Sequence, residues 1–390
     1  MSIRGKLIVA IFASMVALAV ATGALVRSAG ERNVRRAAEL AISSAGEALA
    51  AMERADVEKL DATLSVLAAH PGLAEAFAAR DRPRLLALAA PIFATLKAEH
   101  DITHFYFLEP EPSRACFLRV HRPEQFGDVV TRATLTLAID SRGLGSGKEL
   151  GQTAFALRVV RPWYGRDGGA PLGYLELGEE IDHFLGRMKA QTRDEYGLLV
   201  AKSFLDEQAW AATRQGLRNN WGDRARTVVV DTTTADEAII DFDGDLSSIP
   251  EHGLLLEQDA RDGRIFVRGI VPVKDAAGRR VGGLFVRHDI TALHASMLEA
   301  RRGIYLVLLA VAAVLAGLLV WLVNGLVFRR LDGMVATMDG LSSGLAGGDF
   351  DVGAPRATAD DEIGRFEAHL GRFLQVVAGV LKQRGRKGTG

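Results

Sequence analysis

The chain has 390 residues, enough for two or three domains of ordinary size. Its formal net charge of −1, with 24% charged residues, gives no overall charge excess that would favour a nucleic acid or an acidic partner. Cys116 is the only cysteine, which excludes an intrachain disulfide and any zinc or iron–sulfur site built from cysteines, so a metal would need histidines and carboxylates.

Two apolar runs predict two membrane spans. Residues 7–26 contain no charged side chain and would form a helix about 30 Å long, which matches the hydrocarbon core of a bilayer. Ala19, Val20 and Ala21 resemble a signal-peptidase site, but a cleaved apolar core is usually about 7 to 15 residues long, so we expect an uncleaved anchor. Residues 303–328 form a second uncharged run between arginine pairs, and a buried globular helix is the alternative reading of it.

The distribution of basic residues predicts the orientation of the two spans. Arg4 and Lys6 precede the first span, and the positive-inside tendency keeps such an N-terminus in the cytoplasm. Two spans return the C-terminus to the same side, where the basic residues within 382–387 suit the anionic leaflet. Residues 29–302 should therefore face outward.

The outward segment should begin with helices. Residues 31–69 lack proline, are rich in Ala, Glu, Leu and Arg, and carry apolar side chains at helical spacing, which predicts one long helix. The Pro-Gly pair at 71–72 ends it, and shorter helical patterns continue to about residue 100. Beyond that point, residues 104–108 and 115–120 flank a proline-rich turn and predict a β-hairpin.

Two strand pairs in this segment resemble each other. Residues 157–162 and 172–177, joined by a Gly- and Asp-rich turn, resemble residues 267–272 and 281–286 with their own turn. In both copies a helical start follows the second strand. The repeat predicts two tandem copies of one fold, and a chance similarity between two hairpins is the alternative.

Part of the first copy resembles a known sensory family. The stretches that resemble the double Cache sensory domain of bacterial sensor kinases and chemoreceptors are residues 117–128, 147–151, 155–160 and 173–178. The resemblance covers roughly residues 35–300, is strong over 104–190 and is weaker after that. It implies that each lobe is a PAS-like antiparallel sheet, that the long helix runs beside both, and that the chain is a sensor of the bacterial inner membrane with a periplasmic ligand-binding region.

After the second span, apolar residues recur at alternating spacings of three and four in two stretches. The first seam contains Leu331, Met334, Met338, Leu341 and Leu345, and the second contains Ile363, Phe366, Leu370, Phe373, Val377 and Val380. This period predicts self-association, because one short helix cannot bury either seam. The Gly- and Pro-rich residues 347–355 between the seams should not be helical and are long enough to run back alongside.

This pattern resembles a HAMP domain. Its most diagnostic motif is matched by Asp361, Glu362, Ile363 and Gly364. One departure is Arg330, which stands at the position where that family usually has a proline. The sequence therefore does not decide whether the helix has the usual kink at the membrane exit. The resemblance implies a parallel four-helix bundle in a homodimer, with Leu331, Met334, Met338, Leu341, Asp361, Glu362, Ile363, Gly364, Phe366, Leu370 and Phe373 relaying the signal.

The predicted fold class is α+β, with a long N-terminal helix, two tandem PAS-like antiparallel-sheet lobes, two transmembrane helices and a cytoplasmic HAMP helical hairpin. The expected boundaries are a cytoplasmic N-terminus at 1–6, transmembrane helices at 7–28 and 303–328, a periplasmic sensor at 29–302, HAMP at 329–382 and a basic tail at 383–390. Within the sensor, residues 29–100 should be helical, 101–190 should form the membrane-distal lobe and 191–302 the membrane-proximal lobe.

Candidate ligand-binding residues gather in the distal lobe. Arg119 and His121 are two apart on a presumed strand, so their side chains should share a face, which inside a PAS-like sheet is the pocket floor. A guanidinium offers a planar fork for a carboxylate or other anion, and histidine adds a pH-dependent donor. The alternative is that Arg119 forms a structural ion pair with Asp128 or Glu176. The full predicted set is Arg119, His121, Arg132, Arg158, Tyr106, Asp128 and Glu176.

Four other residues have a less specific pattern. His100 and His104 are four apart, the spacing at which a helix places two metal ligands on one face, but there is no HExxH motif and His104 should open a strand. We therefore predict no metal and no cofactor. Trp163 and Tyr164 are expected on a loop, where they would line a pocket or simply pack.

No enzymatic activity is predicted. Only ten residues follow Val380, so no output domain is expected there, and His369 is expected to be a solvated position of the second HAMP helix. No P-loop, Ser/His/Asp arrangement or paired-carboxylate motif stands out. We expect a homodimeric membrane protein that binds a small molecule, such as a carboxylate or other anion, and assembles with a separate kinase, cyclase or chemoreceptor. The alternatives are a truncated front end of a sensor kinase, diguanylate cyclase or chemoreceptor, and a membrane protein whose Cache lobes bind a partner protein.

Overall fold

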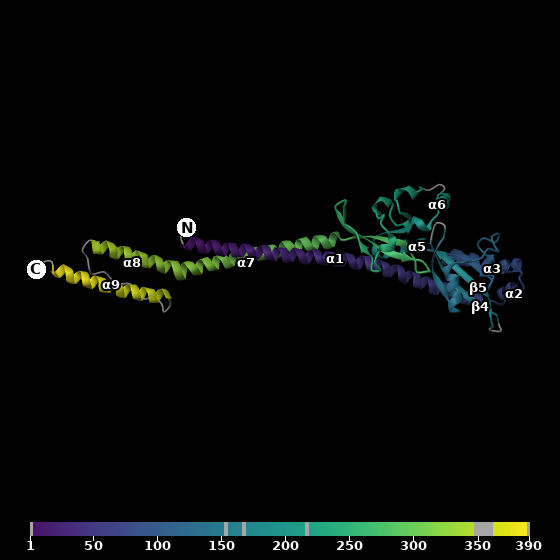
Figure 1. Ribbon diagram of the computed structural model, residues 1–390, viewed down its shortest axis with the longest axis horizontal. Helices are drawn as coiled ribbons and strands as arrows, with labels where there is room; N and C mark the ends of the chain where they lie inside the picture. Colours follow the sequence, from purple (N-terminus) through teal and green to yellow (C-terminus); the bar gives the residue numbers. More distant parts are fainter. Residues whose placement is uncertain (1–2, 152–154, 166–168, 215–217, 347–361, 388–390) are drawn as a thin grey trace. The chain divides into compact units, whose positions relative to one another are not determined.

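The chain forms two compact units. The computed structural model describes residues 3–151, 155–165, 169–214, 218–346 and 362–387. One unit contains Arg32–Ala295, and the other contains Met1–Glu31 together with Ser296–Gly390. Helix α1 (Ile3–Ala68) contributes to both units (Figure 1).

The unit Arg32–Ala295 starts with the helical segment expected from the sequence. α1 runs without interruption to Ala68, and α2 (Pro71–Ala78) and α3 (Arg82–His100) follow. Proline suits the first position of a helix because its missing N–H would have no partner there. The His70 side chain caps α2 by accepting the Leu73 N–H at 3.2 Å. The prediction of one long helix followed by shorter ones is confirmed.

A five-stranded antiparallel sheet with the order β2-β1-β5-β4-β3 forms the distal lobe. Its strands are β1 (Ile102–Leu108), β2 (Cys116–Arg119), β3 (Gly145–Leu150), β4 (Phe155–Tyr164) and β5 (Pro171–Glu180). Successive side chains alternate between faces, so Phe105 and Phe107 pack with α1, α2 and α3. Tyr106 points to the opposite face, where α4 (Ala133–Ser141) packs through Leu135 and Ala138.

A second antiparallel sheet forms the proximal lobe, with the order β7-β6-β11-β10-β8 and with β9 paired to β10. Its elements are α5 (Asp182–Thr192), β6 (Glu195–Ala201), α6 (Glu207–Thr213), β7 (Thr227–Thr232), β8 (Leu254–Leu255), β9 (Asp259–Arg261), β10 (Arg264–Lys274) and β11 (Arg280–Asp289). Each lobe therefore has its first strand beside its last, and its second strand at the edge.

The strand pairing confirms the repeat read from the sequence. Pro162 of β4 pairs with Tyr174 of β5, and Pro272 of β10 pairs with Gly283 of β11. These are equivalent positions of the two sequence copies. The same register therefore recurs in both lobes.

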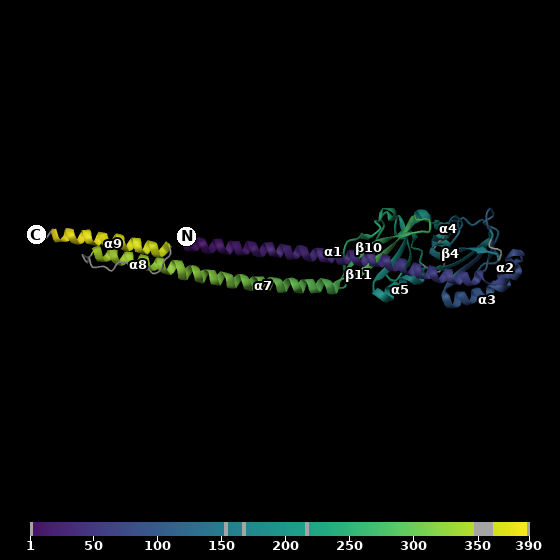
Figure 2. The same cartoon turned by 90° about the horizontal axis from the view of Figure 1, so that it is seen from below.

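α1 packs along both lobes (Figure 2). Leu64 is fully buried in the core that contains distal-lobe residues, and Ile42 packs on β10 of the proximal lobe. Glycines allow the close approach to the proximal sheet. A Cβ on Gly46 would lie 2.8 Å from Val271 Cγ1, and one on Gly269 would lie 2.1 Å from Ile42 Cδ1.

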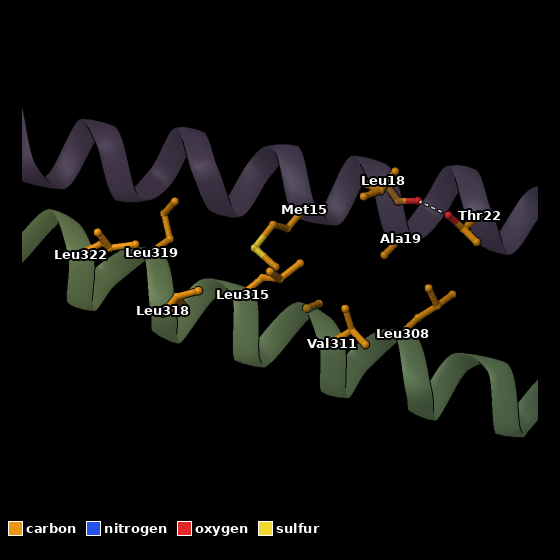
Figure 3. Close-up of a pocket in the computed structure, with 11 residues that line it drawn as sticks. Met15, Leu18, Ala19, Thr22, Leu308, Val311, Leu315, Leu318, Leu319 and Leu322 are labelled. Atoms are coloured by element: carbon orange, nitrogen blue, oxygen red, sulfur yellow. Dashed lines mark hydrogen bonds between the residues drawn. The ribbon is translucent and has the colours of Figure 1, made fainter.

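The other unit contains two helices long and apolar enough to cross a membrane, the early part of α1 and α7 (Thr291–Val323). Tyr305 packs on Gly23, whose carbonyl accepts the Tyr305 hydroxyl at 3.3 Å. An apolar groove of about 410 Å³ lies between the helices, lined by side chains that include Met15 and Leu315 (Figure 3). The orientation of these helices across a membrane stays a prediction.

Helix α7 continues through a π-helical segment (Asn324–Phe328) into α8 (Arg329–Ala346), and α9 (Glu362–Lys387) follows. The π-helical segment ends two residues before Arg330, close to the position where the sequence does not decide whether the helix is kinked. Such segments are common places for a helix to bend. Met334 and Gly364 are buried, and Leu370 is half-buried. The seam residues that are exposed in the single chain are Leu331, Met338, Phe366, Phe373 and Val380.

Part of the predicted relay lies outside the described residues. The backbone is described but the side chain is not for Leu341, Leu345, Glu362 and Ile363, and Asp361 and the connector 347–355 lie wholly outside. The HAMP assignment and the four-helix dimer therefore stay predictions.

Candidate ligand-binding site

The predicted binding residues meet on the face of the distal sheet that carries α4. Tyr106 in β1 lies directly opposite Arg119 in β2 on one side and Glu176 in β5 on the other. Arg158 in β4 pairs with Gly178, two residues along β5 from Glu176, so it shares that face. Opposed residues of an antiparallel sheet project to the same side. Strand pairing alone thus brings four distant parts of the chain together.

Glu176 is the centre of an ion-pair network. Its carboxylate is fully buried and accepts hydrogen bonds from Arg132 Nη2 at 2.9 and 2.7 Å and from Arg158 Nη1 at 2.5 Å. Burial raises the pKa of a carboxyl group, but the two guanidinium charges outweigh burial and hold the pKa of Glu176 below its usual value. Glu176 is therefore an anion at neutral pH and neutralises part of the charge of both arginines.

Arg119 forms a separate and more open pair. Its Nη2 donates to Asp128 Oδ2 at 2.6 Å, and its Nη1 donates to the Gln125 carbonyl at 3.0 Å. The side chain of Asp128 is 51% exposed. This is the structural ion pair that the sequence offered as the alternative role of Arg119. Exposed pairs contribute only about 0–1 kcal/mol, so a ligand carboxylate could replace Asp128 at small cost.

The ring of Tyr106 lies among three guanidinium groups. The Cζ atoms of Arg119, Arg132 and Arg158 are 5.7, 4.8 and 5.4 Å from its centroid. Cations favour the face of an aromatic ring, so Tyr106 helps to hold three like charges in one place. Asp128 pairs with Arg119, and Arg132 and Arg158 share the single carboxylate of Glu176.

Two histidines border the same ring. His104 is stacked on Tyr106 with centroids 6.2 Å apart, and His121 meets Tyr106 and His104 edge-on at 4.8 and 4.9 Å. Burial and the neighbouring guanidinium charges lower the pKa of His104 to about 2 and the pKa of His121 to about 4. Both rings are therefore neutral near pH 7. His121 Nδ1 accepts the Phe105 N–H at 3.3 Å, which places the proton of the neutral ring on Nε2.

The N-terminal end of α4 carries polar atoms that need partners. Arg132 Nε and Thr134 Oγ1 are buried and have no hydrogen-bond partner among the described residues. Because buried polar groups are normally hydrogen-bonded, these atoms mark a place where a further polar group fits. On the same face, a Cβ on Gly178 would lie 3.2 Å from the Leu157 carbonyl oxygen, 3.3 Å from Arg158 Cγ and 3.4 Å from His104 Cβ, so this glycine leaves room for the Arg158 and His104 side chains.

The structure corrects the expected positions of three residues, His121, Trp163 and Tyr164. β2 ends at Arg119, so His121 does not lie on that strand but in the turn after it, where the Arg122 N–H donates to the Arg119 carbonyl at 3.3 Å. Trp163 lies in β4 instead of a loop, and its Nε1 donates to the Ala68 carbonyl at 3.0 Å. Trp163 is therefore a packing residue on the face of the distal sheet that α1, α2 and α3 cover. Tyr164 ends the same strand and is exposed.

The sequence interpretation misses His104 as a member of the cluster. His100 ends α3 and His104 lies in β1, so the two do not share a helical face. Strand alternation from Tyr106 places His104 on the binding face, and that signal was readable once β1 was identified. Which of the clustered residues contact a ligand stays a prediction.

Comparison with known proteins relates this geometry to a family. Residues 33–294 match the family described as the double sensory domain of two-component sensor kinases. The periplasmic domain of Vibrio cholerae LuxQ is similar in structure, with 12% identity, a TM-score of 0.39 and coverage of 64% of this chain and 99% of that chain. So is the ligand-binding domain of the Campylobacter jejuni chemoreceptor Tlp3, solved in complex with L-valine, with 8% identity, a TM-score of 0.40 and coverage of 68% of this chain and 96% of that chain.

No curated protein sequence matches the chain. The family match nevertheless spans more than half of the residues and both lobes of one repeated topology. The chain therefore belongs to the double Cache family, the double sensory domain of two-component sensor kinases.

Proposed function

We propose that the protein is a membrane-bound signal-transduction sensor that binds a small extracytoplasmic anion, such as a carboxylate, in its distal lobe. The observation that carries this proposal is the convergence of three guanidinium groups on Tyr106, two of which share the single carboxylate of Glu176. A carboxylate ligand would add negative charge beside these cations and accept hydrogen bonds from forked donors. The family match supports a sensory role in general, and the cluster supports the ligand class.

We further propose that binding is relayed through α7 to a HAMP dimer. β11 ends at Asp289 and α7 begins at Thr291, so one residue separates the proximal sheet from the helix that contains the second span. The Asp289 carboxylate accepts the Thr291 N–H at 2.8 Å, and the Thr291 hydroxyl accepts the Ile265 N–H at 2.9 Å. A movement of β11 would therefore reach the helix without a flexible linker. A ligand shifts such an equilibrium by its differential affinity for the two states, typically about 1–3 kcal/mol.

We propose that the output comes from a separate kinase, cyclase or chemoreceptor that assembles with the HAMP helices. The cluster of residues around Tyr106 suits recognition of a ligand, and we assign no enzymatic activity to the chain. A truncated front end of a longer receptor and a lobe that binds a partner protein are the competing proposals. Coexpression with each candidate output protein, followed by copurification, separates the first proposal from the other two.

The ligand class is tested with the full chain in lipid nanodiscs. Small carboxylates, inorganic phosphate, amino acids and uncharged analogues are screened by thermal unfolding, since a ligand that binds the folded state raises Tm. A carboxylate that raises Tm is then titrated against the Arg119→Ala variant. We expect a loss of about 1.5 to 3 kcal/mol, or roughly tenfold or more in affinity.

Arg268→Ala is the matched control in the proximal lobe. Arg268 donates to Asp241 at 2.5 Å and to the Glu257 carbonyl at 3.0 Å, and its side chain is 14% exposed against 15% for Arg119. It should cost similar stability and leave affinity unchanged. If Arg119→Ala also loses stability without changing affinity, Arg119 is only a structural ion pair and the distal-site proposal fails.

A further inference from the structure

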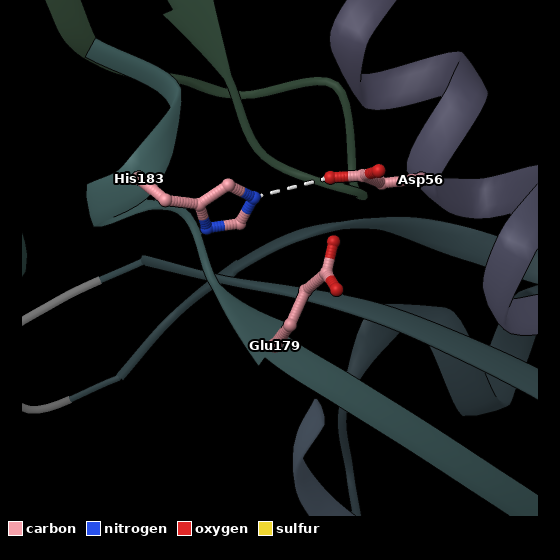
Figure 4. Close-up of side chains that lie close together, drawn as sticks. All are labelled: Asp56, Glu179 and His183. Atoms are coloured by element: carbon pink, nitrogen blue, oxygen red, sulfur yellow. Dashed lines mark hydrogen bonds and ion pairs between the residues drawn. The ribbon is translucent and has the colours of Figure 1, made fainter. Parts of the chain in front are cut away.

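Asp56 of α1, Glu179 of β5 and His183 of α5 form a second cluster, on the face of the distal sheet opposite to Glu176 (Figure 4). One ligand-type atom of each residue lies within 4.8 Å of the other two. Asp56 Oδ2 is 3.2 Å from His183 Nε2. Asp56 and Glu179 are buried, and His183 is half-buried.

The Glu179 carboxylate has one oxygen without a partner. Glu179 is fully buried, and its Oε2 accepts a hydrogen bond from Lys59 Nζ at 2.6 Å. Its Oε1 is also buried and has no hydrogen-bond partner within the part of the chain that the structure describes. Figure 4 shows this carboxylate directed toward the Asp56–His183 pair. Without an ion, a proton shared between the carboxyl groups of Asp56 and Glu179 would satisfy this oxygen, and a bound cation would replace that proton.

We propose that Asp56, Glu179 and His183 form a binding site for a transition-metal ion of the Zn²⁺ class. Carboxylate oxygens and imidazole nitrogens are both ligands that Zn²⁺ takes in proteins. Imidazole favours such ions over Mg²⁺ and Ca²⁺, which take oxygen ligands. An ion among the three residues would give the orphaned oxygen its partner and would leave a coordination position for water.

Lys59 supplies positive charge to the site when no ion is bound. Its Nζ is 2.6 Å from Glu179 and 3.5 Å from Asp56. The Lys59 side chain is 30% exposed, and a lysine stem is flexible, so its ammonium group can move to solvent when an ion enters. Lys59 and the metal therefore compete for the same two carboxylates.

The position of the site gives it a structural consequence. Its three ligands come from the long helix, from the last distal strand and from the helix that leads into β6 of the proximal lobe. A bound ion would join α1 to the connection between the lobes. The proposed metal site contains none of the residues proposed to bind the anion. Failure of one proposal therefore leaves the other unaffected.

The test uses the full chain in detergent, with any affinity tag removed and with metal stripped by EDTA. Calorimetric titration with ZnCl₂ should give one ion per chain, and MgCl₂ or CaCl₂ at the same concentration should give none. Glu179→Gln and His183→Gln should each weaken Zn²⁺ binding at least tenfold. His252→Gln, at an exposed histidine of the proximal lobe, should leave it unchanged. With CoCl₂, the visible absorption bands of bound Co²⁺ should be lost in His183→Gln.

Lys59→Gln decides between a metal site and a structural ion pair. Removing the competing ammonium group should tighten Zn²⁺ binding several-fold, and this gain does not depend on whether the ligand variants fold. The proposal is overturned if neither the native chain nor Lys59→Gln binds one equivalent of Zn²⁺. It is equally overturned if binding is unchanged in folded Glu179→Gln and His183→Gln.

Discussion

At the residue scale, Glu176 and Asp128 show how burial sets the effect of losing an ion-pair partner on the stability of the fold. Both carboxylates accept hydrogen bonds from arginines of the distal cluster, but Glu176 is fully buried and Asp128 is 51% exposed. Removing one partner of a buried pair leaves an uncompensated charge in the interior, whereas an exposed charge is solvated. The two carboxylates should therefore respond very differently to neutral replacement.

Glu176→Gln should destabilise the sensor region by about 3–5 kcal/mol, because Arg132 and Arg158 lose their counter-charge. Asp128→Asn should cost about 0–1 kcal/mol. Thermal unfolding followed by tryptophan fluorescence measures both, since Trp163, Trp210 and Trp221 lie in the unit Arg32–Ala295. Equal losses in the two variants would contradict the assignment of Glu176 as the centre of the network.

His121 should make stability depend on pH. Burial and the nearby arginines lower its pKa to about 4 in the folded protein, whereas an unfolded histidine titrates near 6.5. Between these values only the unfolded chain binds the proton, so the contribution of His121 is complete above about pH 6.5 and is lost as the pH falls toward 4. His121→Asn keeps an acceptor for the Phe105 N–H and should show a smaller fall in Tm between about pH 7.5 and about pH 5. The exposed control His252→Asn should keep the native fall, and indistinguishable profiles for the two variants would argue against this titration.

At the element scale, the contact between α1 and the proximal sheet depends on missing side chains. A Cβ on Gly269 of β10 would meet Ile42 Cδ1 at 2.1 Å and the Leu254 carbonyl oxygen at 2.9 Å. Ile42 can change its rotamer, but the Leu254 backbone belongs to the paired strand β8 and cannot yield easily. A side chain at Gly269 would therefore strain the pairing of β10 with β8 as well as the contact with α1.

Gly269→Ala should destabilise the sensor region by about 1–3 kcal/mol through overpacking. Gly165→Ala is the control, because no other described residue beyond its chain neighbours lies within 4 Å of its Cβ position. It should stay within about 0.5 kcal/mol of the native chain. Tm measurements on both variants provide the comparison. A Gly269→Ala variant as stable as Gly165→Ala would mean that α1 does not pack on β10 as closely as described.

At the scale of the whole molecule, the proposed relay requires a second chain. Leu331, Met338, Phe366 and Phe373 expose apolar surface in the single chain. Seams of this period are buried by partner helices. A homodimer would cover this apolar surface. The test compares a charge placed in the seam with the same charge placed outside it.

Phe366→Asp should abolish dimerisation of the cytoplasmic part, because an unpaired carboxylate would enter the apolar core of the bundle. Gln375→Asp places the same charge on an exposed position between seam residues and should have little effect. Cysteines introduced along residues 303–328 report dimer crosslinks, and the native Cys116 is buried and should not interfere. Crosslinking of Phe366→Asp at the native efficiency would overturn the HAMP assignment, whereas ligand binding should persist in both variants.

Local patterns determined much of this protein. Neighbouring residues alone reveal the helical spacing in residues 31–69, the two apolar runs and each strand pair of the repeat. The periods of these patterns follow from backbone geometry. The family resemblance added the lobes and the helix beside them. Most of the distal cluster was also predictable, since alternation along β1, β2 and β5 places Tyr106, Arg119 and Glu176 on one face once the strands pair.

Tertiary structure alone decided the remaining contacts, because they join residues far apart in the chain through turns and helix packing that have no local period. His121 reaches Tyr106 from a turn, and the strand pattern placed it on β2 instead. Asp56 lies 127 positions from His183, and the two meet only because α1 crosses the end of β5. Burial then sets the charge state of each group, and burial depends on how whole elements pack.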